Sequence, residues 1–202
     1  MLVTKTSLSL HDMIYRISSE LHVDYLELVS YIPDAGYGMP PRVRLTMSKH
    51  EFKRRSLSSI RKQICGDREY VIGVSSSVRA GGEAFHLPQI DFSCDVDSSN
   101  EERIYDALNE MNMRSGYLLE SGNSYHFHGM DLMPHEFWTR FMDRLENYAT
   151  DERPLVDETW LDESAIDRGF SILRLSANVS KRVTPKVIAK VDDEQIPLFN
   201  MK

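Results

Sequence analysis

The sequence of 202 residues predicts an α+β fold built on an RRM-like, ferredoxin-like core with the element order βαββαβ. Three observations carry this prediction. Apolar and polar residues alternate strictly over 90–97, and apolar residues then recur at helical spacing. Two short predicted strands joined by a tight turn follow. A second amphipathic helix then precedes the last predicted strand. In this topology the first and third strands are neighbours and both helices cover one face, so the other face is expected to be free.

The first half of the core is a strand followed by a helix. Apolar and polar residues alternate over 90–97, as in a strand with one buried face. Either Ser98 or Ser99 can cap the following helix, because each has a glutamate three residues further on. Apolar residues then recur at helical spacing as far as Met111.

The second half supplies two strands, a helix and a final strand. Residues 116–120 and 124–128 predict strands joined by a turn at 121–123. Pro134 suits the first turn of a helix. The buried stripe expected for that helix is Phe137, Phe141, Met142, Leu145 and Tyr148. After an acidic loop, residues 169–176 predict the fourth strand.

Residues 1–69 precede this core, and we expect them to form a helical, basic part that packs on residues 70–202. Apolar residues between Leu8 and Ile32 recur at helical spacing, and Pro and Gly residues within 33–41 then break the chain. Residues 49–62 hold six Lys or Arg residues and one Glu. This basic run is either a solvated helix face or a surface for anions.

Composition restricts the class of protein. The net charge of −7 argues against a large nonspecific nucleic-acid surface unless the cations are segregated. Cys65 and Cys94 are too few for a disulfide framework or a four-cysteine zinc site. There is no apolar run of membrane-spanning length and no signal-peptide pattern at the N-terminus. We therefore expect a cytoplasmic protein with no membrane partner.

Asp95 and Asp97 are the first candidates for chemistry. They are two residues apart in the predicted strand, so both side chains should project from the same face of the sheet, the one that the helices do not cover. Two converging carboxylates repel each other unless cations neutralise them. Mg²⁺ and Mn²⁺ prefer such oxygen ligands, and in a two-metal site they would activate the attacking oxygen and stabilise the leaving group.

Two further groups are expected to join these acids. Ser124 and His126 share a face of the third strand, which should lie beside the first. Asp167 precedes the fourth strand, which is expected to flank the first, and Arg174 on that strand suits phosphate binding. We prefer Asp167 as the third acid, and the competing candidates are Asp157, Asp162 and Glu163.

Three motifs in this order resemble those of the archaeo-eukaryotic primase superfamily. The first is Cys94-Asp95-Val96-Asp97, a hydrophobic strand ending in Asp-x-Asp. The second is Ser121-Gly122-Asn123-Ser124-Tyr125-His126, which carries Ser-x-His after Ser-Gly. The third is Ile166-Asp167 ahead of a strand with Arg174. The resemblance covers roughly residues 70–190.

The resemblance implies a primase-polymerase-like nucleotidyltransferase that transfers nucleotides from NTP or dNTP to a single-stranded or primed nucleic-acid template. It implies that Asp95, Asp97 and Asp167 bind the catalytic Mg²⁺ or Mn²⁺. It also implies that Ser124, His126, Arg174, Lys181 and Arg182 bind the nucleotide. A helicase or another replication or repair protein is an expected partner.

Two other functions remain open from the residues alone. An RRM-like sheet can serve as an inactive nucleotide- or nucleic-acid-binding module. Alternatively, His126, His128 and Asp131 can act as ligands of a metallohydrolase, because His-x-His on one strand face suits zinc.

Overall fold

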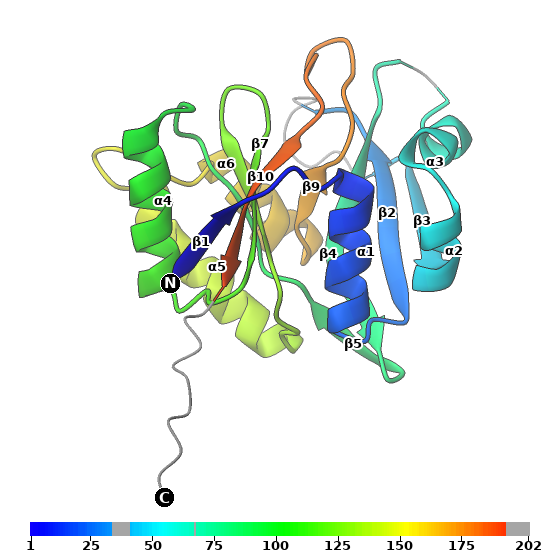
Figure 1. Ribbon diagram of the computed structural model, residues 1–202, viewed down its shortest axis with the longest axis horizontal. Coiled ribbons are helices and arrows are strands. Elements are labelled where there is room, and N and C mark those ends of the chain that lie inside the picture. Colours follow the sequence, from blue (N-terminus) through cyan, green and yellow to red (C-terminus); the bar gives the residue numbers. More distant parts are fainter. Residues whose placement is uncertain (34–40, 67, 193–202) are drawn as a thin grey trace, which may run out of the picture.

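The fold was obtained as a computed structural model that describes residues 1–33, 41–66 and 68–192, without the side chains of 165–167. Two antiparallel five-stranded sheets lie side by side (Figure 1). Within these described residues, no helix combines the length and the apolar character that a membrane crossing requires. The predicted chain break within 33–41 falls mostly outside the described residues.

The first sheet contains the first three strands of the predicted core. In spatial order its strands are β1 (Leu2–Lys5), β10 (Lys186–Asp192), β7 (Gly116–Glu120), β8 (Tyr125–Gly129) and β6 (Gln89–Asp91). The helices α4 (Ser98–Glu110) and α5 (His135–Ala149) pack on one face, where Leu108 and Trp138 join Leu118 and Phe127 in one apolar cluster. The predicted neighbourhood of the first and third strands is confirmed, because β6 pairs with β8.

The second sheet draws on distant parts of the chain. Its strands are β3 (Val43–Ser48), β2 (Tyr25–Tyr31), β4 (Val71–Ala80) and β5 (Glu83–His86), and β9 (Ile172–Arg174) also pairs with β4. The helices on this side are α1 (Leu10–Glu20), α2 (Lys49–Arg54) and α3 (Leu57–Ile64), as Figure 1 shows. The short α6 (Glu158–Asp162) and a π-helical turn, Glu163–Arg168, precede β9.

The predicted N-terminal helical extension is wrong, because the chain starts with a strand that pairs with β10. Helical spacing was predicted between Leu8 and Ile32, but within that stretch only Leu10–Glu20 is helical. The segment Tyr25–Tyr31 forms β2, whose alternating residues Leu26 and Leu28 are buried against α1 and β4. The apolar positions of β2 happen to continue the helical spacing, so periodicity alone did not separate the two elements.

The prediction that one face of the core sheet is free is also wrong. Tyr117 and Leu119 of β7 share a buried cluster with Ile17 of α1 and Val74 of β4. The second sheet and its helices therefore cover much of the face opposite α4 and α5. Burying these side chains removes apolar surface from water, which is the main force that holds the two halves together.

The fourth predicted strand exists, but it does not flank the first. β9 pairs with β4, with Arg174 opposite Gly73. A Cβ atom on Gly73 would lie 2.5 Å from Ile172 Cγ2, so the missing side chain allows this close approach.

Two details of the helices differ from prediction. The N-cap of α4 is Asp97, whose carboxylate accepts from the Asn100 N–H, and not a serine. In α5 the buried stripe contains Trp138, whereas Phe137 is 57% exposed. The helix begins at His135, and this start sets which aromatic residue points to the sheet.

Candidate functional site

A cavity of about 710 Å³ opens between the two sheets, where β6, β8 and β9 come together. Its walls come from the first sheet, the turn 121–124, α6 with the π-helical turn, and the segment 180–183. The lining combines carboxylates, a histidine and several cations, and we call it the cleft. Its main charged and polar members are Asp91, Ser121, Ser124, His126, Asp157, Glu163, Arg168, Arg174, Lys181 and Arg182.

Asp91 and Asp157 bring two carboxylates to one side of the cleft. Asp91 is the last residue of β6, and the Asp157 N–H donates to its carbonyl oxygen over 2.9 Å. A β-bridge between Phe92 and Val156 holds the two backbones in this register. The Asp157 carboxylate also caps α6, accepting from the Trp160 N–H at 2.8 Å. The pair is thus fixed by backbone hydrogen bonds.

His126 lies directly opposite Asp91 in the β6–β8 ladder. Its Nε2 is 3.4 Å from an Asp91 carboxylate oxygen, and the ring is buried. Burial, and then electrostatic interactions with His128, Arg174 and Lys181, hold the pKa of His126 well below its usual value. The imidazole is therefore neutral, and its contact with Asp91 is a polar contact and not an ion pair.

Arg174 ties the cleft together from the second sheet. Its guanidinium donates to the carbonyl oxygens of Ser176, at 2.9 Å, and of Val183, at 2.5 Å. A further bond reaches the carbonyl of Ser121, in the turn after β7. One buried side chain therefore connects β9, the segment that carries Lys181 and Arg182, and the first sheet.

The cationic wall of the cleft is more exposed. Lys181 and Arg182 both face solvent at its mouth. Asn178 shapes their segment, because its side-chain oxygen accepts from the Lys181 N–H at 2.6 Å. Cations that are accessible and held on an ordered loop suit the binding of phosphate groups.

Ser124 lies in the tight turn that joins β7 and β8. Its carbonyl accepts from the Ser121 N–H at 2.8 Å, and the two hydroxyls are 3.0 Å apart. Gly122 has a φ of +120°, which a residue with a side chain rarely adopts. The turn thus holds Ser124 at the edge of the cleft, directly before the strand that carries His126.

Asp95 and Asp97 do not lie where the sequence predicted. β6 ends at Asp91, so both residues follow the strand and are exposed, and neither lines the cleft. Asp97 caps α4 instead. The prediction extended the alternating pattern over the whole of 90–97, but the chain leaves the sheet after its first residues. Asp91 has the same phase in that pattern, and this could have identified it.

Asp167 lies in the π-helical turn Glu163–Arg168, and its side chain is outside the described part of the structure. Two of the competing candidates line the cleft, namely Asp157 and Glu163. The Glu163 carboxylate forms an ion pair with Arg168. The pattern Val156-Asp157, a hydrophobic residue before an acid, was available in the sequence and resembles Ile166-Asp167.

A divalent cation fits the donor set of the cleft. Among the described residues, no three or more His, Cys, Asp or Glu side chains form a group that could hold a metal alone. Mg²⁺ is commonly held by only one or two carboxylates, and substrate phosphates and waters complete its octahedron. Asp91 and Asp157 supply such a pair, with the cationic wall lining the same cavity.

The alternative ligand set of His126, His128 and Asp131 finds less support in the geometry. His128 is buried, and this burial lowers its pKa to about 3. Its Nε2 bonds to none of the described residues. Neither His128 nor Asp131 lines the cleft with His126.

Comparisons with known proteins identify the family and a similar fold. A family described as AEP-like, archaeo-eukaryotic primase 1D-like, matches residues 48–187. The fold is similar to the crystal structure of primase RepB', with a TM-score of 0.51 and 13% identity over 91% of this chain and 56% of that one. The chain thus spans about half the length of that primase. No curated protein sequence matches it significantly.

Proposed function

Because the chain belongs to the archaeo-eukaryotic primase-like family, we propose that it is a metal-dependent nucleotidyltransferase that adds nucleotides from nucleoside triphosphates to a nucleic-acid strand. One observation carries the proposal beyond family membership. Asp91 and Asp157, whose backbones are hydrogen-bonded to each other, share a cleft with a buried histidine and with exposed cations. This combination suits a triphosphate bound through a divalent cation.

In this proposal, Asp91 and Asp157 take the roles that the sequence motif gave to Asp95, Asp97 and Asp167. Mg²⁺ or Mn²⁺, when bound by these two carboxylates, would neutralise phosphate charge and lower the pKa of the attacking hydroxyl. The backbones of Asp91 and Asp157 are held in register by the hydrogen bond between them, so the two residues need little backbone reorganisation when the substrate enters.

The remaining residues bind and orient the nucleotide. Lys181 and Arg182 reach the phosphates from the mouth of the cleft. His126 is neutral, and its Nε2 can orient the Asp91 carboxylate. Arg174 donates three hydrogen bonds to backbone carbonyls, so we assign it a positioning role for the 180–183 segment. Ser124 contributes a hydroxyl at the edge of the cleft.

The test uses labelled nucleoside triphosphates, Mg²⁺ or Mn²⁺, and a primed or unprimed single-stranded template. We expect Asp91→Asn and Asp157→Asn each to lower incorporation by at least about 100-fold, the size of effect seen when one transition-state contact is removed. Asp95→Asn and Asp97→Asn are matched controls and should stay within a few-fold of the unmodified protein. Equal losses in both pairs would overturn the assignment of the acids.

A second candidate function is a nucleotide-binding module without turnover. The observation that favours it is Ser93, which occupies the position two residues after Asp91, where the family's first motif has a second acid. The Ser93 hydroxyl bonds to the Pro154 and Val156 carbonyls. A labelled triphosphate that binds the cleft, with no incorporation under Mg²⁺ or Mn²⁺, would favour this candidate over the enzyme.

A further inference from the structure

We propose that a second cavity, between α1, the α2–α3 junction and the start of β10, binds single-stranded nucleic acid where the strand leaves the cleft. We call this cavity the basic pocket, and its volume is about 600 Å³. The inference rests on the proposed function and adds the path of the strand. It also gives a role to the basic run at 49–62, which the cleft does not use.

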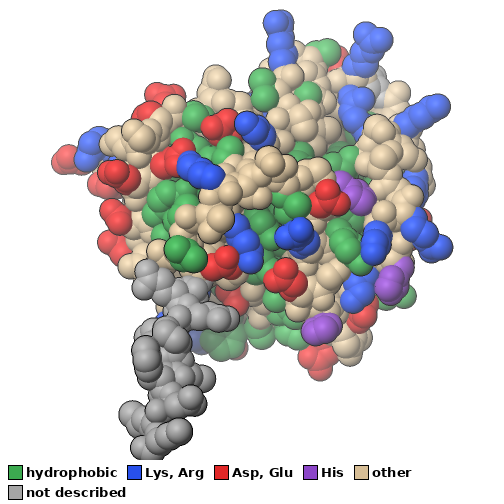
Figure 2. Space-filling view, viewed as in Figure 1, with side chains coloured by type: hydrophobic (Ala, Val, Ile, Leu, Met, Phe, Trp, Pro, Cys, Tyr) green, Lys and Arg blue, Asp and Glu red, His purple; other side chains and the backbone are tan. Residues whose placement is uncertain are grey.

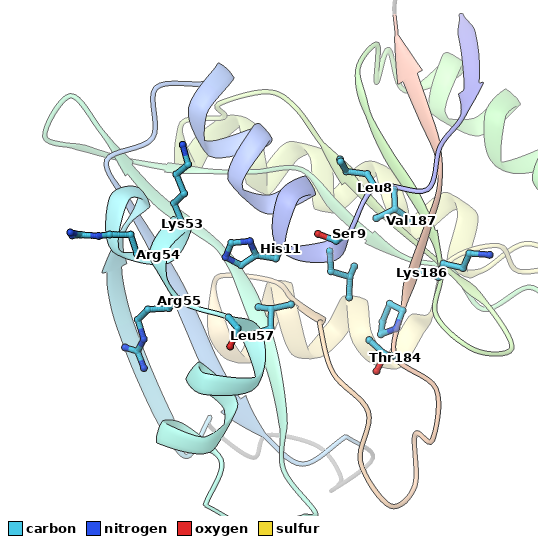
Figure 3. A pocket seen from close by; sticks show the side chains of 13 residues that line it. Leu8, Ser9, His11, Lys53, Arg54, Arg55, Leu57, Thr184, Lys186 and Val187 are labelled. Atoms are coloured by element: carbon cyan, nitrogen blue, oxygen red, sulfur yellow. The ribbon is translucent and has the colours of Figure 1, made fainter.

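The basic pocket has an apolar floor between two cationic sides. Figure 3 shows Lys53, Arg54 and Arg55 on one side and Lys186 on the other. The floor between them consists of apolar side chains from three stretches of chain, namely Leu8, Leu10, Leu57, Pro185 and Val187. Lys53, Arg54 and Lys186 are exposed, so their charges are accessible to a ligand.

The charge of the pocket is segregated from that of the rest of the molecule. None of its described lining residues is acidic. Two acids outside the lining pair with lining residues: Asp12 lies 4.0 Å from His11, and Glu51 partly neutralises Arg55 at 3.4 Å. In Figure 2, Lys and Arg gather on the side of α2 and α3, whereas Asp and Glu are more frequent on the side of α4. A protein with a net charge of −7 thus presents one locally positive region.

The pocket is continuous with the cleft along the chain. Lys181, Arg182 and Val183 line the cleft, and the next residues, from Thr184 to Val187, line the pocket. Lys181 and Arg182 at the cleft mouth and Lys186 in the pocket therefore lie within one short stretch of chain. A strand with one phosphate for each nucleotide fits such a series, because each phosphate can meet a new cation.

The apolar floor indicates a single strand and not a duplex. A duplex keeps its bases stacked inside and presents mainly phosphates, so it would leave the floor exposed to water. An unpaired base has an apolar face that can lie on leucine, proline and valine side chains while its phosphate meets the rim. An acidic amphipathic peptide would suit the same rim and floor, but it gives no reason for the continuity with the cleft.

The test measures binding of a fluorescently labelled single-stranded oligonucleotide by anisotropy at several salt concentrations. The test variant is Lys53→Glu with Lys186→Glu, and the control is Arg114→Glu with Arg140→Glu, an equal charge change at exposed positions after α4 and on α5. We expect the test variant to bind about 10-fold more weakly than the control. The slope of log K against log salt should also fall by about 1.4, or about 0.7 for each lost contact.

Two further readings separate the possible failures. Binding of a fluorescent nucleoside triphosphate to the cleft should be the same in both variants. A failure of the proposed function would therefore appear in triphosphate binding and not in oligonucleotide binding. A duplex of the same sequence should bind the unmodified protein more weakly than the single strand. Equal oligonucleotide affinity in the two variants, or a preference for the duplex or for an acidic peptide, would overturn the proposal.

Discussion

The two sheets contribute opposite charges to the cleft. The first sheet supplies Asp91 at the end of β6 and His126 on β8. The second supplies Arg174 on β9, and the chain that follows β9 carries Lys181 and Arg182. Neither sheet alone therefore holds a site for a metal–triphosphate complex. The comparison teaches that this chemistry depends on the docking of two halves, so contacts across the junction should matter most.

The largest effect on stability is expected from Arg174→Met, which removes the hydrogen bonds that connect the two halves of the molecule. Three carbonyls that now accept from Arg174 would lose their donor, those of Ser121, Ser176 and Val183. The bond to Ser121 is buried and the other two are partly buried, so the loss of their donor should lower the free energy of unfolding by about 3 kcal/mol in urea titrations.

The control for Arg174 is Arg44→Met, in the second sheet. Arg44 forms a forked ion pair with Glu27, but its side chain is 49% exposed. Such surface pairs contribute about 0–1 kcal/mol, so this variant should change little. Similar losses in the two variants would show that Arg174 is not a tie between the sheets.

Two glycines allow a direct comparison of close packing in the two sheets. A Cβ on Gly116, in β7, would lie 2.4 Å from a Phe127 ring carbon and 2.6 Å from the His128 carbonyl oxygen. A Cβ on Gly73, in β4, would meet mainly side-chain ends, of Ile172 at 2.5 Å and Tyr31 at 2.8 Å. Since a backbone atom cannot move aside alone, Gly116→Ala should cost about 2–3 kcal/mol and Gly73→Ala less, again from urea unfolding. The reverse order would contradict this reading of the packing.

A smaller, pH-dependent effect is expected where β5 meets α5. His86 lies 3.2 Å from His135 and stacks on Trp138, and burial with the charge of His135 lowers its pKa to about 4. Between about pH 6.5 and pH 4, His86 is protonated in the unfolded chain but stays neutral in the folded protein. The free energy of unfolding therefore falls as the pH is lowered through this range. One pKa unit corresponds to about 1.4 kcal/mol, and with screening we expect roughly 1–2 kcal/mol in total.

The measurement for His86 compares urea unfolding of the unmodified protein and His86→Gln at several pH values from 7.5 to about 4.5. Other buried histidines, such as His128, contribute to both curves and cancel in the difference. The variant should lose part of the pH dependence. Two parallel curves would show that His86 does not titrate as described.

The smallest effect is expected from Asp97→Ala, which removes the cap of α4. Loss of an N-cap typically costs about 1 kcal/mol, here measured as a lower unfolding midpoint. Nucleotide incorporation should persist, because Asp97 does not line the cleft. Asp95→Ala is the control and should change neither quantity. A loss of incorporation in the stably folded Asp97 variant would instead support Asp97 as a catalytic acid, as the sequence motif first indicated.

Some of the site was predictable from local pattern. His126 follows from the strand after the Ser-Gly turn, and its strand is the predicted neighbour of the first. Lys181 and Arg182 were expected from the family resemblance and not from local pattern, and they line the cleft. The acids were harder, because Asp91, Asp95 and Asp97 share one phase of one alternating run. The end of the strand decides between them, and periodicity does not mark that end.

The sequence by itself determined the segments whose contacts are local: α4, β7, the turn at 121–123, β8 and α5 follow one another along the chain. Hydrophobic period, turn residues and caps act within a few residues, so they can be read directly. Only the tertiary structure decided that β9 joins β4 and that Asp157 lies beside Asp91. These pairings depend on which distant surfaces bury each other, and no local pattern records that choice.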